Sequence, residues 1–210
     1  MLSDDAITEC LSQYGVHASR TQCEQVRSYI SLLLKWNRSI SLTSVTEEME
    51  ILRFHFGESV FALSAVKGVN GRLADVGTGA GFPGLPLRIF GKEIDLLLIE
   101  SNAKKCAFLA EVVRQLRLDS VRVVKARFED ETDELRGKLH VVVARALGGY
   151  DDLLSWSKTV LKSAGRIVIW IGEGDAPKIA SFTDWNWNSP ILLPNSQNRC
   201  ILVGSPRNHR

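Results

Sequence analysis

The feature that most constrains this chain is a glycine-rich segment between two apolar runs. The first run ends at Val76, and four glycines follow between residues 77 and 84. A second apolar run, residues 94–99, ends in Glu100, 19 residues after Gly81. Glycine lets the backbone approach a ligand where a Cβ would clash. A strand, a glycine turn, a helix and a strand ending in an acid predict a βαβ unit that binds a nucleotide or nucleoside, with Glu100 accepting hydrogen bonds from ribose hydroxyls.

Two ligands compete for this unit. Residues 79–84 match the pattern G-x-G-x-x-G, in which a helix N-terminus faces a dinucleotide pyrophosphate. Asp75, however, lies at the strand tip beside the loop, where a carboxylate repels a pyrophosphate and suits a cation. S-adenosylmethionine carries a sulfonium and an ammonium and has no phosphate. The residues therefore favour this methyl donor and leave a nicotinamide-dependent oxidoreductase as the alternative.

The remainder of the chain alternates between strand and helix patterns, which predicts an α/β, mostly parallel, doubly wound sheet over residues 69–210. Strands are predicted at 72–76, 94–99, 121–125, 139–144, 166–171 and 199–203, and helices at 84–90, 102–116, 149–161 and 175–182. Residues 183–198, rich in Trp, Asn and Pro, are predicted to form a loop.

Residues 1–68 are predicted to form a helical extension that packs on this core. Thr21-Gln-Cys-Glu24 matches a capping box and opens a helix with an apolar stripe. A further helix is predicted from about Thr46 to Ala65, and a turn from Gly68 to Gly71.

Ligands of open α/β sheets bind at the carboxyl ends of the strands. The glycine loop, Glu100, Phe128-Glu129 and Arg145 each follow a predicted strand, so all of them converge on one crevice. Phe128 can pack on an adenine face, although a core aromatic is an equally good interpretation. Arg145 ends a strongly apolar strand, and a salt bridge closing the sheet edge, to Asp75 for example, is the alternative to a ligand contact.

Composition excludes several classes of protein. The four cysteines are scattered without a C-x-x-C pair, and the four histidines do not cluster, so we expect no disulfide framework and no metal. No apolar run approaches the roughly 18 residues of a membrane span, and the acidic N-terminus lacks the basic region of a secretory signal. These features predict a cytoplasmic, monomeric protein with buried free thiols that does not bind a membrane.

Charge is unevenly distributed. The net charge of +2 argues against bulk electrostatic binding to nucleic acid. Residues 101–127, however, hold seven bases against two acids, and Arg207 and Arg210 lie in a C-terminal tail without acids. Taken alone, this pattern is typical of a solvated surface.

The sequence resembles one family, the N7-guanine methyltransferases of bacterial small-subunit ribosomal RNA (methyltransferase G). The resemblance rests on Lys35-Trp-Asn37 with Ser41-Leu-Thr43, Arg53-Phe-His55 through Ser59, Asp75 through Leu87, Glu100 with Lys104-Lys105, Ala126-Arg-Phe-Glu129, and Ala144-Arg-Ala146. It implies a Rossmann-like class I fold, S-adenosylmethionine as cofactor, and 16S ribosomal RNA or the small ribosomal subunit as partner. The chain departs from the family's usual residues at Glu58, at Ala144 and around Trp170-Ile-Gly172.

The resemblance implies contacts with the methyl donor at Gly77, Phe82, Phe128-Glu129 and Arg145, and the sequence pattern described above adds the other site residues. The cofactor-binding set is Asp75, Gly77, Gly79, Phe82, Glu100, Phe128, Glu129 and Arg145, and the RNA-binding set is Arg53, His55, Lys104, Lys105 and Arg199. Guanine N7 has an exposed lone pair and no proton, so methyl transfer to it needs positioning and no general base. We therefore predict no catalytic acid or base. A non-catalytic RNA-binding or assembly protein with the same fold is the remaining alternative.

Overall fold

The computed structural model describes residues 1–66, 71–91, 93–146 and 148–207. Its strands form one sheet in the order β3-β2-β1-β4-β5-β8-β6, with β7 paired to β8. The strands are β1 Arg72–Val76, β2 Asp95–Glu100, β3 Val121–Lys125, β4 Leu139–Arg145, β5 Leu161–Gly172, β6 Trp185–Trp187, β7 Ile191–Leu192 and β8 Arg199–Pro206. The strands from β3 to β5 pair in parallel, and β8 pairs antiparallel with β5, β6 and β7. The predicted mostly parallel α/β sheet is confirmed.

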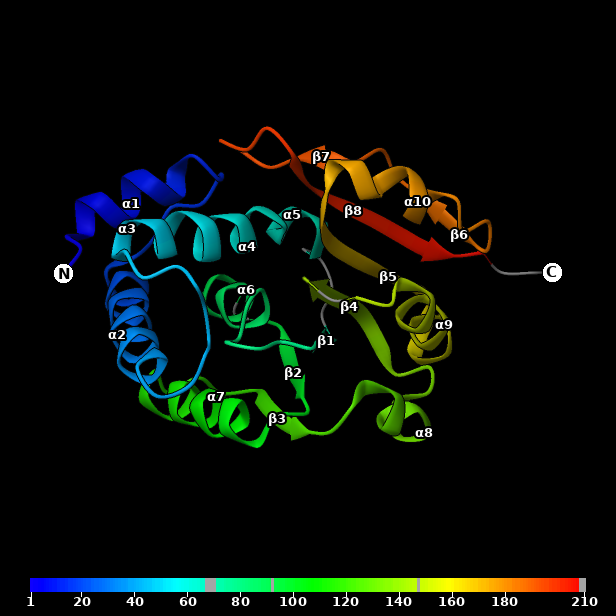
Figure 1. The fold of residues 1–210 in the computed structure, drawn as a ribbon, viewed down its shortest axis with the longest axis horizontal. Coiled ribbons are helices and arrows are strands. Elements are labelled where there is room, and N and C mark those ends of the chain that lie inside the picture. Colours follow the sequence, from blue (N-terminus) through cyan, green and yellow to red (C-terminus); the bar gives the residue numbers. More distant parts are fainter. Residues whose placement is uncertain (67–70, 92, 147, 208–210) are drawn as a thin grey trace.

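Helices cover both faces of this sheet (Figure 1). The helical segments are α1 Asp4–Ser12, α2 Arg20–Asn37, α3 Glu48–Glu50, the π-helix η1 Ile51–Gly57, α4 Glu58–Phe61, α5 Leu63–Val66, α6 Gly84–Phe90, α7 Ala103–Gln115, the 3₁₀ turn η2 Phe128–Glu131, α8 Thr132–Leu135, α9 Tyr150–Val160, the 3₁₀ turn η3 Glu173–Asp175 and α10 Ala176–Ala180. In Figure 1 the blue and cyan N-terminal helices lie on one side of the strands, and α8 and α9 lie on the other.

Buried side chains of the central strands point alternately to the two faces of the sheet, and each face has its own hydrophobic core. In β2, Leu96 and Leu98 pack with the N-terminal helices, α6 and α7, whereas Leu97 and Ile99 pack with α9 on the opposite face. This follows from the two-residue period of a strand, since successive side chains point to opposite faces. The N-terminal extension therefore shares one continuous core with the sheet.

The N-terminus of α2 differs from the prediction. The capping box is formed by Ser19 and Gln22, not by Thr21 and Glu24. Both pairs fit the same sequence pattern, but Gln22 in the observed box also donates through Nε2 to the carbonyl of Ile89, at 3.0 Å. This tertiary contact with α6 explains why the helix begins one residue before Thr21.

The helix predicted from about Thr46 to Ala65 is confirmed in extent, with helical residues from 48 to 66 apart from a turn at Ala62, but its π-helical register was not predicted. The segment is divided into α3, η1, α4 and α5, with a π-helical stretch at its centre. A π-helix has a wider turn and rotates the residues that follow it relative to an α-helix. Here the stretch carries His55 and leads directly into Glu58, two residues of the site described below.

The other predicted helices and strands are confirmed with small shifts at their ends, except that β5 begins at Leu161. Helix α1 was not predicted, and the predicted loop over 183–198 contains the short strands β6 and β7. Residues 68–70 of the predicted turn Gly68–Gly71 lie outside the described residues. The same holds for the predicted boundary between the extension and the sheet domain, at residues 68 and 69, and for Arg210 in the tail. All four cysteines are buried and unpaired. Among the described residues, none of the helices is both long and apolar enough to cross a membrane.

Candidate functional site

The glycine loop after β1 leaves open space at its tip. Gly79 has φ +59°, a left-handed conformation that favours glycine, and a Cβ added there would meet nothing closer than the Gly77 carbonyl at 3.9 Å. Gly81, at φ +91°, is instead packed tightly, because a Cβ there would collide with Tyr29 and Leu85. The tip therefore offers backbone to a ligand, while the base of the loop is held against α2.

Asp75 anchors this loop from beneath. Its side chain is fully buried, and Oδ2 accepts hydrogen bonds from the Thr78 hydroxyl at 2.6 Å and the Gly84 amide at 2.8 Å. Its Oδ1 has no partner among the described residues. Burial raises the pKa of Asp75 to about 7, with the hydrogen bonds from Thr78 and Gly84 opposing that shift. The Asp75–Arg145 ion pair considered as an alternative does not form, since Arg145 pairs with Glu58.

Glu100 lies at the end of β2 beside the loop tip. Its Oε2 accepts from the Gly79 amide at 3.0 Å and its Oε1 from the Asn102 amide at 2.8 Å. The carboxylate is nearly buried, with 8% of the residue exposed. Two backbone donors thus fix its orientation and leave lone pairs for further donors, as a ribose diol would require.

Phe82 lies in a stack of aromatic side chains that joins the loop to the N-terminal extension. Its ring is parallel to that of Tyr29, with centroids 5.2 Å apart, and is tilted against His55 at 4.8 Å. The Tyr29 hydroxyl also donates to the carbonyl of Ala80 in the loop. Phe82 is therefore mostly occupied in packing, and only its 8% exposed part is available to a ligand.

His55 lies inside this stack rather than on an RNA-facing surface. Its Nε2 is 2.8 Å from the Thr43 hydroxyl, and its buried Nδ1 has no partner among the described residues. Burial, reinforced by the nearby positive charge of Arg145, lowers the pKa of His55 to about 4. The ring is neutral at pH 7, so its placement favours support of the loop over direct pairing with phosphate.

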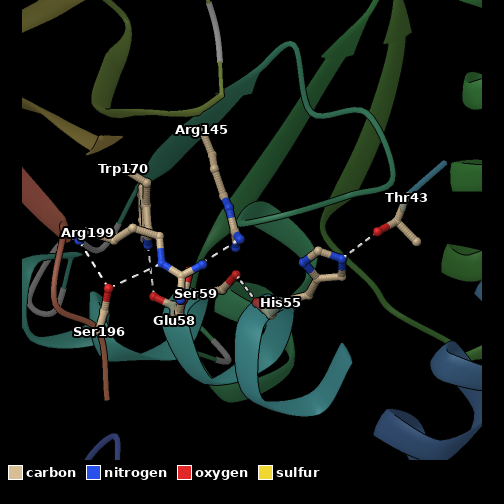
Figure 2. A network of polar contacts seen from close by, with 8 residues as sticks. All are labelled: Thr43, His55, Glu58, Ser59, Arg145, Trp170, Ser196 and Arg199. Atoms are coloured by element: carbon tan, nitrogen blue, oxygen red, sulfur yellow. Dashed lines mark hydrogen bonds and ion pairs between the residues drawn. The ribbon is translucent and has the colours of Figure 1, made fainter. Parts of the chain in front are cut away.

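Glu58 holds two arginines from distant parts of the chain. Its carboxylate is 3.2 Å from Arg145 Nη2 at the end of β4 and 2.8 Å from Arg199 Nη2 at the start of β8. Its backbone carbonyl accepts from Trp170 Nε1 at 2.8 Å. Figure 2 shows Arg145 and Arg199 both directed at Glu58. Glu58 is only 1% exposed, so the pair of guanidinium groups compensates a charge that would otherwise be costly to bury.

The residues predicted to meet adenine lie in η2. Phe128 is half-buried and packs edge-on against Trp156 with ring centroids 5.3 Å apart, while Glu129 is exposed. Phe128 therefore contributes to the second core, as the alternative interpretation of this residue held, and its exposed part faces solvent beside the end of β3.

The predicted RNA-binding residues other than His55 reach the surface. Arg53 and Lys104 are exposed, and Lys105 is half-buried in the first turn of α7. That turn has Asn102 as its cap and contains no acid, so two lysines lie where the helix dipole disfavours positive charge. Arg199 is 40% exposed and lies over the Phe54 ring at 5.0 Å.

The structure thus brings the glycine loop, Glu100 and Arg145 to the carboxyl edge of adjacent strands, as predicted. Sequence reasoning missed three contributions: Tyr29, the ion pairs of Glu58, and the aromatic stack that contains His55. One signal was present for Glu58, which is the one acid in Phe56-Gly-Glu-Ser-Val-Phe61, among residues that are otherwise apolar or small. Among the described residues, no group of three His, Cys, Asp or Glu side chains is placed to hold a metal ion.

Comparison with solved structures defines the class of protein first. The fold is similar to that of a ribosomal protein L11 methylase from Lactobacillus delbrueckii, with a TM-score of 0.62 and 17% identity over 74% of this chain and 80% of that one. It is also similar to a precorrin-6y C5,15-methyltransferase from Geobacter metallireducens, with a TM-score of 0.60 and 15% identity over 80% and 92%. The fold is that of the class I methyltransferases.

Comparison of sequences then defines the family. The model of the family described as rRNA small subunit methyltransferase G matches residues 22–187. Proteins named ribosomal RNA small subunit methyltransferase G are 40% identical in Desulfitobacterium hafniense, over 72% of this chain, and 30% identical in Photobacterium profundum, over 94% of this chain and 95% of that relative. The match with the Desulfitobacterium protein covers 63% of that protein's length. The chain belongs to the methyltransferase G family.

The family and the fold establish S-adenosylmethionine as the cofactor and resolve the choice between the two candidate ligands. The site is consistent with this molecule. The loop tip at Gly79 is open, Glu100 presents an oriented carboxylate, and Asp75 holds the loop from beneath. A cation is favoured in such surroundings, and a pyrophosphate is not.

Proposed function

We propose that this enzyme transfers a methyl group from S-adenosylmethionine to N7 of a guanine in 16S ribosomal RNA of the small ribosomal subunit. The observation that supports the proposal most strongly is the family match over residues 22–187, which includes both the glycine loop and Arg145. The relatives are named as methyltransferases of small-subunit ribosomal RNA. The choice of guanine N7 comes from the family resemblance.

In this proposal the cofactor is held along the carboxyl ends of β1, β2 and β3. Glu100 accepts from the ribose hydroxyls, and the loop from Gly77 to Phe82 lies against the methionine part. Phe128 and Glu129 meet the adenine, one by ring contact and the other at its edge. Arg145 contributes positive charge at the end of β4, next to the loop.

Methyl transfer to guanine N7 requires the protein mainly to position the two reactants. When bound, the cofactor supplies a methyl group on a sulfonium, an electrophile that needs no activation by the protein. Guanine N7 is unprotonated at neutral pH, so its lone pair can attack without a general base. The role of the chain is then to hold the two reactants in line, to exclude water and to balance charge. The buried Glu58–Arg145 pair provides charge for the last of these tasks.

The RNA is proposed to meet the same edge of the sheet. Lys104 and Lys105 at the start of α7 and Arg199 at the start of β8 lie at this edge, and these side chains, with the exposed Arg53, can contact phosphates. Half or more of the hydrogen bonds in nucleic-acid complexes go to the backbone, where they set position rather than sequence. The substrate is 16S RNA, either free or within an assembling or complete small subunit, and the enzyme acts as a monomer in the cytoplasm.

Mass mapping of methylated guanines tests this function. Small subunits from cells that lack the chain are incubated with purified protein and S-adenosylmethionine carrying a deuterated methyl group. We expect one new 7-methylguanosine in 16S RNA, shifted by the mass of the label. RNA binding without methyl transfer would instead support the non-catalytic assembly protein, and label on another base or atom would contradict the choice of N7.

A further inference from the structure

A cavity of about 330 Å³ lies at the carboxyl ends of β4 and β5, outside the loop that holds the cofactor. Its walls include Arg145, Tyr150, Trp170 and Asp175. Pockets for small ligands have volumes of roughly 300–1,000 Å³, so this cavity is at the small end of that range. It has room for one flat heterocycle and not for a dinucleotide.

The cavity adjoins the donor site through the sheet itself. β4 pairs in parallel with β1, and Val76 is in register with Ala144. The next residues are Gly77, at the start of the glycine loop, and Arg145, in the cavity wall. A ring held in the cavity is therefore one strand away from the cofactor loop.

The cavity is lined by side chains of both charges, and these side chains differ in how many of their polar atoms already have partners. Arg145 forms an ion pair through Nη2, while its buried Nη1 has no hydrogen-bond partner among the described residues. Asp175 is exposed, and its side chain makes no capping hydrogen bond to α10, the helix it precedes. The other two charged wall residues, Glu58 and Arg199, pair with each other, and Glu58 also pairs with Arg145.

The aromatic residues limit how a ring can lie. Trp170 is buried, and its indole N–H is committed to the Glu58 carbonyl, which fixes the ring in the wall. Tyr150 begins α9 at the mouth of the cavity and is only half-buried. A planar ligand can pack against Tyr150 while its edges point toward Arg145 on one side and Asp175 on the other.

Guanine has the matching pattern of donors and acceptors. Its O6 and N7 are acceptors on one edge, and its N1–H and 2-amino group are adjacent donors on the next. We propose that this cavity takes the target guanine, with Asp175 accepting from N1–H and the 2-amino group and Arg145 donating to O6. This inference rests on the proposed methyl transfer to guanine N7.

The arrangement gives a physical reason for the choice of both base and atom. O6 and N7 share an edge, so a guanine whose O6 meets Arg145 turns N7 toward the β1 side, where the cofactor loop lies. Adenine would present its 6-amino group to Arg145 and its unprotonated N1 to Asp175. Two donors would then face each other on one side and two acceptors on the other, so adenine is rejected.

Nucleotide binding tests the assignment independently of methyl transfer. Dissociation constants for guanosine, inosine and adenosine 5′-monophosphates are measured by ligand-observed NMR on the full chain and on Asp175→Asn. Inosine lacks the 2-amino group, so the unmodified protein should bind guanosine monophosphate most tightly and adenosine monophosphate most weakly. A bidentate contact to a base contributes enough to change affinity about tenfold, and Asp175→Asn should weaken guanosine binding by that factor and abolish the preference over inosine.

Glu173→Gln is the matched control. Glu173 is an exposed acid in the same turn, η3, but does not line the cavity. This variant removes the same charge and should keep all three affinities. If Asp175→Asn retains the preference for guanosine, or if the unmodified protein binds the three nucleotides equally or not at all at millimolar concentration, the assignment is overturned.

Methylation of small-subunit RNA by the same preparations separates the two proposals. If the unmodified protein forms 7-methylguanosine and Asp175→Asn retains the nucleotide preference, only the role of the cavity is wrong. If no 7-methylguanosine forms while the preference depends on Asp175, the cavity is a guanine site and the proposed reaction is wrong.

Discussion

At the scale of single residues, the carboxyl edge of the sheet is built from buried charges with specific partners. Glu58 forms ion pairs with Arg145 and Arg199, which lie on strands far apart in the sequence. Among the residues that the structure describes, Arg145 Nη1 and Asp75 Oδ1 are buried without a hydrogen-bond partner. Unpaired buried polar atoms are costly, so their presence beside an open loop indicates places where ligands complete the hydrogen bonding.

Replacement of Arg145 by lysine should lower activity even though the charge is retained. Arginine has a planar guanidinium that pairs with Glu58 through Nη2 while its second terminal nitrogen can serve another partner. Lysine has a single ammonium and cannot do both in this geometry. A hydrogen bond to a charged group contributes roughly 1.5–3 kcal/mol, so kcat/KM should fall about tenfold or more. Thermal unfolding and methyl transfer are measured on one sample. Normal activity per folded molecule would show that Arg145 serves only to close the sheet edge.

Asp75 should make the stability of the protein depend on pH. Burial raises its pKa from 3.8 to about 7, so the folded state binds this proton more tightly than the unfolded state does. The resulting stabilisation is complete below pH 3.8 and is lost as the pH rises through 7. Asp75→Asn keeps an oxygen for Thr78 and Gly84 but does not titrate. Urea unfolding from pH 4 to 8 should show the variant gaining stability relative to the original chain, and parallel curves would refute the shift.

At the scale of elements, helix α2 of the N-terminal extension supports the glycine loop. Tyr29 stacks on Phe82, and its hydroxyl donates to the Ala80 carbonyl. The π-helix η1 adds His55 to the other side of Phe82. The extension therefore packs directly on the glycine loop and helps to fix its shape.

Removal of the Tyr29 hydroxyl should loosen this loop. In Tyr29→Phe the stacked ring remains, but the buried Ala80 carbonyl loses its donor, at a cost of about 1–3 kcal/mol. Part of that cost should appear as weaker cofactor binding. We expect the dissociation constant of S-adenosylmethionine, measured by isothermal titration calorimetry, to rise about three- to tenfold. Tyr14→Phe is the control, since Tyr14 is a buried tyrosine of the same extension that packs against Gly57 instead of the loop. Equal effects of both changes on cofactor affinity would contradict the proposed support.

At the scale of the whole molecule, the net charge is only +2, but the positive charges are unevenly distributed along the chain. Lys104 and Lys105 lie at the start of α7, just after the carboxyl end of β2, whereas Lys138 and Lys162 lie at the opposite, amino edge of the sheet. A small net charge means that RNA affinity depends on where positive charge lies more than on its total.

Charge reversal of Lys104 and Lys105 should therefore impair RNA recognition selectively. We expect a higher KM for small-subunit RNA and a salt dependence reduced by about one to two counterions, with cofactor affinity unchanged. The double reversal of Lys138 and Lys162 changes the net charge equally at the other edge and should have a much smaller effect. Equal loss in both variants would mean that total charge, and not the α7 turn, governs RNA binding.

The sequence by itself determined the features that depend on neighbouring residues. The glycine loop, the acid at Glu100 and the alternation of strands and helices follow from local sterics and hydrophobic period, and these placed Arg145 at the same edge as the loop. Tertiary structure decided the rest. Ser19 rather than Thr21 caps α2 because Gln22 reaches Ile89, and Glu58 meets Arg145 and Arg199 only when the folded chain brings them together. Such long-range contacts have no local pattern, since their energy comes from desolvation and packing that exist only in the folded chain.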